Sequence, residues 1–443
     1  TVYQPESQAI AHVLYHEWFP QILYDPHQSG PAGNVLFTGL MRDPSNPNLS
    51  FLMAPSTELI TAAIFSRYVQ EGKPGAVCRT MANYQNWYCG GLRNTGCFHN
   101  IIAFMSEING NPTPMEISFR PEKLFPNNDN PYPVTPQKWH IRQAIEYLIT
   151  AQRAILDISS RYRDQFLFNM YRMGKNSIER GSQDSWTITP KRVAAAEEAI
   201  KKDKAEIFDE RGRSQGAPLK YFNEYLRDPA LRDPRGYIIP SDQADFLTAT
   251  KFVNALIRSG VTVHRAASSF EVEGKTYPWG SYVIQTAQAF RPHIIDLFEP
   301  QDHPDDIPWP GAPPIPPYDN AGYTLALQMG VQYERILEGF EGPFEKIDGF
   351  AKPSAGKVIS PDAFGFLLSH QVNDAFIAIN RLLEGDEQVF WLKSPNEIKG
   401  VSYPAGTIYI PAKGSTMDKL QKMADEIGLH FDSINSKPSG EAY

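Results

Sequence analysis

Two short segments of the sequence place side chains that can do hydrolytic chemistry at the ends of apolar strands. His27 follows the strand-like run Ile22–Asp25, and Glu107 closes the apolar run Ile101–Ser106. Ligands in α/β folds bind at the C-terminal edges of strands, where a neutral imidazole can bind zinc. A partly desolvated carboxylate needs a compensating partner, and it can act as a general base on water activated by a metal. The two segments predict one zinc ligand, His27, and one catalytic acid–base residue, Glu107.

Each of these residues also has a simpler interpretation. A hydrogen-bonded surface histidine in a turn would explain His27, and a salt-bridged glutamate at the rim of a sheet would explain Glu107. Taken alone, the local sequence favours these simpler interpretations, because short motifs often match by chance.

An aromatic loop with two adjacent glycines lies between the two segments. It runs from Asn83 to Arg93 and contains Tyr84 and Tyr88. Glycines among aromatic residues permit a close approach of the backbone, as in a loop that lines a substrate site, and the guanidinium of Arg93 could bind a carboxylate. A packed aromatic surface loop is the alternative. The hypothesis of a substrate loop names Tyr88 and Arg93 as substrate-binding residues.

Composition and missing motifs exclude several other classes. The formal net charge is −8, which argues against nucleic-acid or anionic-membrane partners, and no apolar run is long enough to span a bilayer. The sequence has no Gly-rich phosphate loop and no G-x-S-x-G turn. Its three cysteines are too few for a zinc ribbon, although a disulfide between Cys89 and Cys97 is compatible with their spacing. The chain begins at Thr1 without a signal peptide, and we expect it to be part of a longer protein.

The elements that must position these residues follow an α/β pattern. Residues 1–125 alternate strand and helix signals, with strands expected at 22–25, 34–41, 75–81 and 101–108. Residues 126–235 are expected to be a mainly helical connecting region, with a helix beginning at Thr135-Pro136. Two related α/β units, 236–345 and 346–443, follow. They share the sequences Y-P-W-G-S-Y-V-I at Tyr277–Ile284 and Y-P-A-G-T-I-Y-I at Tyr403–Ile410.

Five segments of the chain resemble the M14 family of zinc metallocarboxypeptidases, and especially its large bacterial members, which carry extra α/β domains after the catalytic domain. The resemblance covers residues 1–110, where the segments come in the family's order with similar spacing. The segments are Gln4–Ile10, Tyr24–Gly30, Asp43–Asn48, Asn86–Thr95 and Phe98–Glu107. Less specifically, the two Tyr-Pro-x-Gly units are similar to the glutamine-amidotransferase-like region of those proteins. All three cysteines precede residue 100, so a working glutaminase in these units is implausible.

The resemblance implies a mixed carboxypeptidase-like sheet and hydrolysis of a peptide or peptide-like amide bond. His27 matches the family's second histidine ligand to zinc, and Glu107 matches the glutamate that takes a proton from zinc-bound water and delivers it to the leaving amine. Tyr88 or Tyr84 would be the family's aromatic hydroxyl, and Arg93 would contact the substrate. The resemblance also implies a periplasmic or secreted location.

One part of the family's pattern is missing. Its His-x-x-Glu ligands and its substrate-carboxylate arginines lie upstream of the point where this sequence begins. A catalytic zinc needs about three protein ligands, so we expect the missing ligands in an N-terminal segment of the same protein or in a separate chain. The expected partners are a peptide substrate and either that missing segment or further copies in a homo-oligomer. A catalytically inactive peptidase scaffold with a binding or structural role is the alternative. A third hypothesis keeps the zinc hydrolysis but assigns an amidated amino acid or a cell-wall peptide as substrate.

Overall fold

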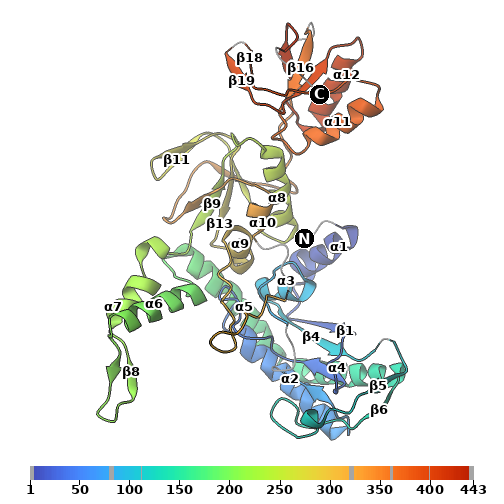
Figure 1. Ribbon diagram of the computed structural model, residues 1–443, viewed down its shortest axis with the longest axis vertical. Coiled ribbons are helices and arrows are strands. Elements are labelled where there is room, and N and C mark those ends of the chain that lie inside the picture. The colour runs from blue at the N-terminus through green and yellow to red at the C-terminus, as the bar shows by residue number, and fades with distance from the viewer. Residues whose placement is uncertain are drawn as a thin grey trace.

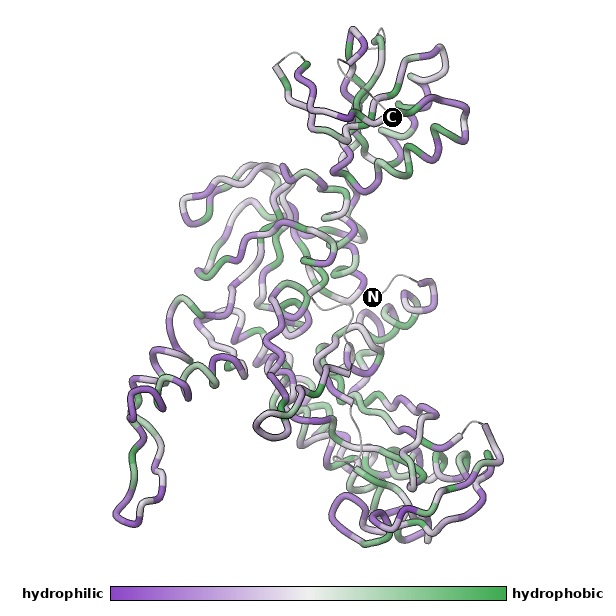
Figure 2. Tube along the Cα trace, viewed as in Figure 1, coloured by the Kyte–Doolittle hydropathy of each residue, from purple (hydrophilic) through white to green (hydrophobic). Residues whose placement is uncertain are grey.

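The computed structural model describes residues 4–78, 84–110, 112–318, 324–359, 363–398 and 400–438, and the chain has the expected α/β architecture (Figure 1). Hydrophobic and hydrophilic residues alternate along its helices (Figure 2), as expected of helices that cover a sheet with one face. In the described part of the chain, no helix is both long enough and apolar enough to cross a membrane.

The N-terminal part is built on a four-stranded mixed sheet of strand order β1-β4-β2-β3. Its strands coincide with the four runs expected from the sequence, although residues 79–81 of the third run lie outside the described residues. The elements are α1 (Pro5–His12), a π-helical turn η1 (Val13–Trp18), β1 (Ile22–His27), β2 (Leu36–Thr38), α2 (Met53–Gln70), β3 (Ala76–Val77), α3 (Leu92–Phe98) and β4 (Ile102–Ile108).

The two faces of this sheet are covered by different helices. A Cβ atom added to Gly96 of α3 would lie 2.9 Å from the Cβ of Ala103 and 3.5 Å from Leu23, so α3 packs directly on the face that these two residues share. On the opposite face, the Tyr24 ring packs against Phe104, and helix α2 lies there together with α4 (Figure 1). Because side chains alternate along a strand, every second residue after Leu23 and Ala103 lies on the α3 face.

The connecting region is mainly helical, as expected, but it begins with a strand. Residues 137–139 pair with β5 instead of starting the helix expected at Thr135-Pro136. The helix starts at Ile141, where His140 and Gln143 form a reciprocal capping box. The elements are β5 (Met115–Ile117), a 3-10 turn η3 (Pro121–Lys123), β6 (Gln137–Trp139), α4 (Ile141–Arg161), α5 (Arg163–Ser182), α6 (Pro190–Lys202), β7 (Ile207–Phe208), β8 (Ser214–Gly216), α7 (Leu219–Tyr221), η4 (Phe222–Leu226) and η5 (Pro229–Leu231).

Two antiparallel sheets with equivalent strand orders follow. The first has the order β14-β9-β13-β10-β15 and the second has the order β17-β20-β16-β21, so β9, β13, β10 and β14 correspond to β16, β20, β17 and β21. The first sheet's elements are β9 (Gly236–Ile239), α8 (Phe246–Arg258), β10 (His264–Ala266), β11 (Phe270–Val272), β12 (Lys275–Tyr277), β13 (Tyr282–Gln285), α9 (Arg291–Phe298), α10 (Leu325–Gln328), β14 (Glu334–Ile336) and β15 (Phe344–Lys346). The second sheet's elements are β16 (Gly365–Leu368), α11 (Ala375–Glu384), β17 (Phe390–Trp391), β18 (Asn396–Ile398), β19 (Val401–Tyr403), β20 (Ile408–Pro411), α12 (Thr416–Ile427) and β21 (Asp432–Ile434).

The hydrophobic core is continuous between the N-terminal sheet and the first antiparallel sheet. Buried residues of β4, α8 and α9, such as Phe104, Phe252 and Phe298, belong to one cluster. The last unit has a separate core around Phe366 and Leu420, and it lies at the far end of the molecule in Figure 1. The described chain therefore consists of a large two-sheet body and a smaller unit with its own core.

Candidate functional site

His27 and Glu107 lie side by side on neighbouring parallel strands. The register of β1 and β4 pairs Ile22 with Ile102 and continues without a break until His27 pairs with Glu107. His27 is four residues after Leu23 and Glu107 is four residues after Ala103, so both lie on the α3 face. The two residues that the sequence places 80 positions apart therefore share one edge and one face of the sheet.

The His27 imidazole is held by the carboxylate of Asp25. Its Nε2 lies 2.9 Å from Asp25 Oδ2, and the two residues share a face because they are two positions apart. A carboxylate can only accept a hydrogen bond, so Nε2 carries the proton in the neutral ring and Nδ1 keeps its lone pair. The His27 side chain is 49% exposed. An exposed imidazole whose second nitrogen is fixed by a carboxylate has the arrangement of a metal-binding histidine.

Glu107 is buried to a much greater degree and is held by two hydrogen bonds. It is 5% exposed, and its Oε2 accepts the backbone N–H of Ser29 at 2.7 Å. A second hydrogen bond joins it to the phenol of Tyr84. Burial, with the neighbouring negative charge of Glu107, raises the pKa of Tyr84. The phenol therefore stays protonated and donates to the Glu107 carboxylate.

A segment from the first antiparallel unit packs against the loop that carries Tyr84 and Gln85. The Tyr318 ring meets the Tyr84 ring edge-on, with 4.7 Å between centroids. The Arg42 guanidinium lies 3.2 Å from the Asp306 carboxylate, and His303 Nε2 lies 3.1 Å from Gln85 Oε1. The proline-rich segment, residues 301–318, thus packs against the residues that surround Glu107. The sequence of this segment indicates a stiff extended connection. No local feature of it indicates that the segment packs against the Tyr84 loop.

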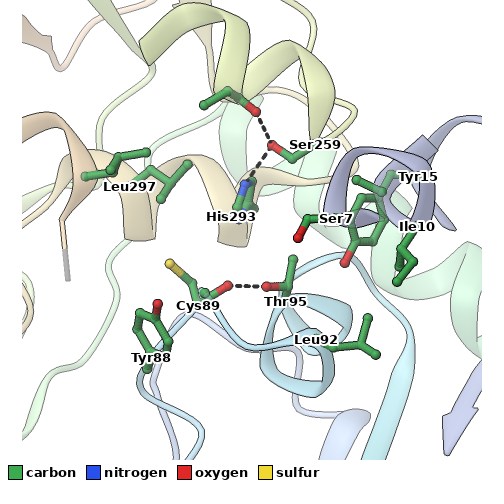
Figure 3. A pocket seen from close by; sticks show the side chains of 14 residues that line it. Ser7, Ile10, Tyr15, Tyr88, Cys89, Leu92, Thr95, Ser259, His293 and Leu297 are labelled. Carbon is green, nitrogen blue, oxygen red and sulfur yellow. Dashed lines mark hydrogen bonds between the residues drawn. The ribbon is translucent and has the colours of Figure 1, made fainter. Parts of the chain in front are cut away.

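Tyr88, the residue preferred from the sequence, lies in a different cavity from Tyr84. It lines a cavity of about 160 Å³ together with Cys89 and His293. Figure 3 shows this cavity between the turn that carries Tyr88, helix α1 and helices α8 and α9. Of the two tyrosines considered for the aromatic hydroxyl, Tyr84 is the one that contacts Glu107.

Arg93 is buried under the same sheet face as Glu107. Its guanidinium approaches the sulfur of Met105 at 2.6 Å and donates to the backbone oxygen of Gln85 at 3.3 Å. Met105 is two positions before Glu107 on β4, so Arg93 lies beside the candidate site. Arg93 also lines a mainly apolar cavity of about 260 Å³.

A cluster of buried titratable groups lies where helix α9 meets the N-terminal part. Asp296 Oδ1 accepts hydrogen bonds from the amides of Asn46 at 3.1 Å and Gln301 at 2.8 Å, and burial raises the pKa of Asp296 to about 7. Burial lowers the pKa of His99 to about 4. Burial and the nearby Asp296 raise the pKa of the Cys89 thiol. These groups did not stand out in the sequence, because nothing local indicates that they are buried.

The structure has no disulfide at the cysteines. Cys78, Cys89 and Cys97 are all free thiols. The Cys97 thiol contacts the backbone oxygen of Ala103 at 3.3 Å, while Cys89 interacts with Asp296. The Cys89–Cys97 disulfide that their spacing allows is therefore not formed.

The residues fit a zinc ion in part. His27, with its ring held by Asp25, has the chemistry of one ligand, and the carboxyl group of Glu107 lies on the neighbouring strand at the paired position. Within the described ranges, no group of three or more His, Cys, Asp or Glu side chains could hold a metal ion. Comparisons of the chain with models of protein families, with curated proteins and with solved structures gave no match.

Proposed function

We propose that this protein is a zinc-dependent hydrolase of the metallocarboxypeptidase type that cleaves a peptide or peptide-like amide bond. The observation that carries the proposal is the parallel register that pairs His27 with Glu107 on one sheet face. If the two residues lay on opposite faces, a shared reaction centre would not be possible. The pairing supports a site at which one metal ligand and one acid–base residue act on the same substrate.

The roles of the side chains follow from their environments. A bound zinc ion would polarise the scissile carbonyl and lower the pKa of the attacking water. The Glu107 carboxylate accepts the proton of that water and then delivers it to the leaving amine. The Ser29 N–H and the Tyr84 hydroxyl hold the carboxylate in place, and Asp25 orients the His27 ring. Arg93 lines the neighbouring cavity and bounds the space for a substrate side chain.

The metal needs more ligands than His27 alone. A catalytic zinc usually has three protein ligands and one open position, so we propose that the other ligands come from an N-terminal segment of a longer form of this protein or from a second copy in a homo-oligomer. The likeness to secreted and periplasmic peptidases supports a location outside the cytoplasm. The same likeness supports a glutamine-amidotransferase-like origin of the last two units without glutaminase activity.

The test compares Glu107→Gln with wild type in the complete, zinc-loaded protein. The amide keeps the size of the side chain but cannot take up the proton, so turnover of blocked dipeptides should fall by about 10² or more, while bound zinc stays nearly unchanged. Glu116→Gln, which alters an exposed glutamate on β5, is the matched control and should keep full activity. Wild-type activity in Glu107→Gln would refute the assignment.

The small number of metal ligands also favours a second candidate function. In this alternative the protein is a non-catalytic scaffold that binds a partner. The observation behind it is the lack of a three-residue metal group among the described residues. Elemental analysis of the complete wild-type protein separates the two functions. About one zinc per molecule together with hydrolysis supports the enzyme, whereas far less zinc and no hydrolysis supports the scaffold.

A further inference from the structure

A groove of about 520 Å³ lies between the two antiparallel units, remote from His27 and Glu107 in the fold. The last unit lies next to the preceding unit (Figure 1), and Leu247 of helix α8 packs against its core. Polar contacts join the two units as well. Asn373 donates its backbone N–H to Asp245 Oδ2 at 3.0 Å, and Lys251 forms an ion pair with Asp374. These contacts fix the two walls of the groove relative to each other.

Equivalent loops of the two units line the groove. The loop after β9, residues 241–244, corresponds to the loop after β16, residues 369–372, and both contribute side chains to the groove. The turn before β13 contributes Trp279, and the equivalent turn before β20 contributes Tyr403 and Pro404. The same pair of loops therefore faces the groove from each side.

Trp279 presents an exposed aromatic surface in this groove. The side chain is 57% exposed, although its turn is well fixed. Ser241 Oγ donates to the backbone oxygen of Trp279 at 2.8 Å, and Gly280, with a φ of +85°, donates its N–H to Ala266 O at 2.9 Å. The Arg265 guanidinium lies 5.9 Å from the indole centroid. The turn that carries the ring is thus fixed before any ligand arrives, which reduces the entropy lost on binding.

The polar groups of the groove favour an uncharged ligand. The Tyr403 hydroxyl donates to Asp432 Oδ2 at 3.1 Å, which holds a half-buried carboxylate in the wall. Arg265 and Asp432 carry opposite charges, and neutral side chains such as Ser369 and Gln371 supply further donors and acceptors. A phosphorylated or strongly acidic polymer would need many more basic groups than Arg265 and His430, which line this groove together with Asp432.

We propose that this groove binds a neutral oligosaccharide, independently of the zinc chemistry. The apolar face of one sugar ring packs on the Trp279 indole, which offers a large amphipathic surface at low entropic cost. Hydroxyl groups of the neighbouring sugars bond to Asp432 and Gln371. A peptide ligand would pair with an open strand edge, whereas loops and turns line most of this groove.

The experiment measures binding of cellotetraose, chitotetraose and an uncharged tetrapeptide to the full chain by calorimetry and tryptophan fluorescence. At least one of the two oligosaccharides should bind, and Trp279→Ala should weaken its binding by about tenfold or more. Trp309→Ala is the matched control, because that indole is 65% exposed and lies outside the groove, and it should bind as wild type does. Asp432→Asn, which keeps the shape of the side chain, should also weaken binding.

Three results would overturn the proposal. They are no binding of either oligosaccharide at millimolar concentration, equal binding by wild type and Trp279→Ala, or binding of the tetrapeptide alone. Circular dichroism of each variant shows whether it is folded. If Trp279→Ala does not fold, Asp432→Asn decides the question, and unchanged affinity in that variant refutes the proposal.

Discussion

Replacing Asp296 by asparagine tests whether one buried carboxyl group makes the stability of this protein depend on pH. The Asp296 side chain is 1% exposed, and burial raises its pKa to about 7. Asparagine has nearly the same shape and keeps an oxygen that can accept from the Asn46 and Gln301 amides. The substitution thus removes a titrating proton and keeps the two hydrogen bonds.

The magnitude follows from the difference between the folded and unfolded pKa values of Asp296. An aspartate in an unfolded chain ionises near pH 4, so between about pH 4 and pH 7 the folded protein holds a proton that the unfolded chain has released. The free energy of unfolding therefore falls as the pH rises through this window, by about 1.4 kcal/mol per pH unit and on the order of 4 kcal/mol in all. Below about pH 4 and above about pH 7, the contribution of Asp296 to the free energy of unfolding does not change with pH.

Other groups titrate in the same pH window. Their effect on stability cancels when Asp296→Asn is compared with wild type. Burial lowers the pKa of His99 to about 4, so between about pH 4 and pH 6.5 the unfolded chain binds the extra proton and His99 makes stability rise with pH. This opposes the effect of Asp296 in wild type. His99 is present in both proteins, however, so it cancels in the difference between Asp296→Asn and wild type.

Urea unfolding, followed by circular dichroism at several pH values from about 4.5 to about 7.5, measures this difference. The stability of Asp296→Asn relative to wild type should increase by about 3 kcal/mol or more over this range and then level off. Asp305→Asn alters an exposed aspartate near the same helix, and its difference from wild type should stay flat. A difference for Asp296→Asn that changes by less than about 1 kcal/mol would show that the carboxyl group is not desolvated as the fold indicates.

Two further predictions concern the candidate site. Asp25→Ala should lower the affinity of the complete protein for zinc by about 10–100-fold, measured by equilibrium dialysis, because it removes the carboxylate that fixes the orientation of the His27 ring; unchanged affinity would show that Asp25 does not position the ligand. Tyr84→Phe should lower kcat more than it changes KM in peptide hydrolysis, because it removes the hydroxyl that holds Glu107. Tyr318→Ala removes the ring contact with Tyr84 and the hydrogen bond between the two phenols, but it leaves the Tyr84 hydroxyl on Glu107. It should have the smaller effect; the reverse order would contradict this account.

The sequence predicts the strands of the N-terminal sheet because their apolar runs are long and bounded by turns. It also predicts that His27 and Glu107 lie at strand ends. It does not predict their pairing, which depends on the register of β1 and β4 across about 80 residues of intervening chain. The helix start expected at Thr135 failed for a related reason, since residues 137–139 pair with β5 and tertiary pairing overrode a local capping signal.

Local sequence also cannot decide between Tyr84 and Tyr88. The two residues lie in one loop without helical or strand periodicity, and only the path of the backbone places Tyr84 at Glu107 and Tyr88 in the cavity of Figure 3. The contact of Tyr318 with Tyr84 joins residues more than 200 positions apart. No periodicity or motif reports contacts of this kind, so the surroundings of Glu107 could be learned only from the fold.

The different exposure of the two site residues bears on how the metal site would be completed. Glu107 is enclosed, with the Ser29 N–H and the Tyr84 hydroxyl already bonded to its carboxylate. His27 is half exposed, and its Nε2 is used by Asp25, while among the described residues its Nδ1 has no recorded partner. Additional ligands can therefore approach the His27 side from solvent without displacing the groups around Glu107. In the proposed enzyme, Glu107 and its hydrogen-bond partners would already be in place, so completing the metal site would need the addition of a segment or a subunit and no rearrangement of the sheet.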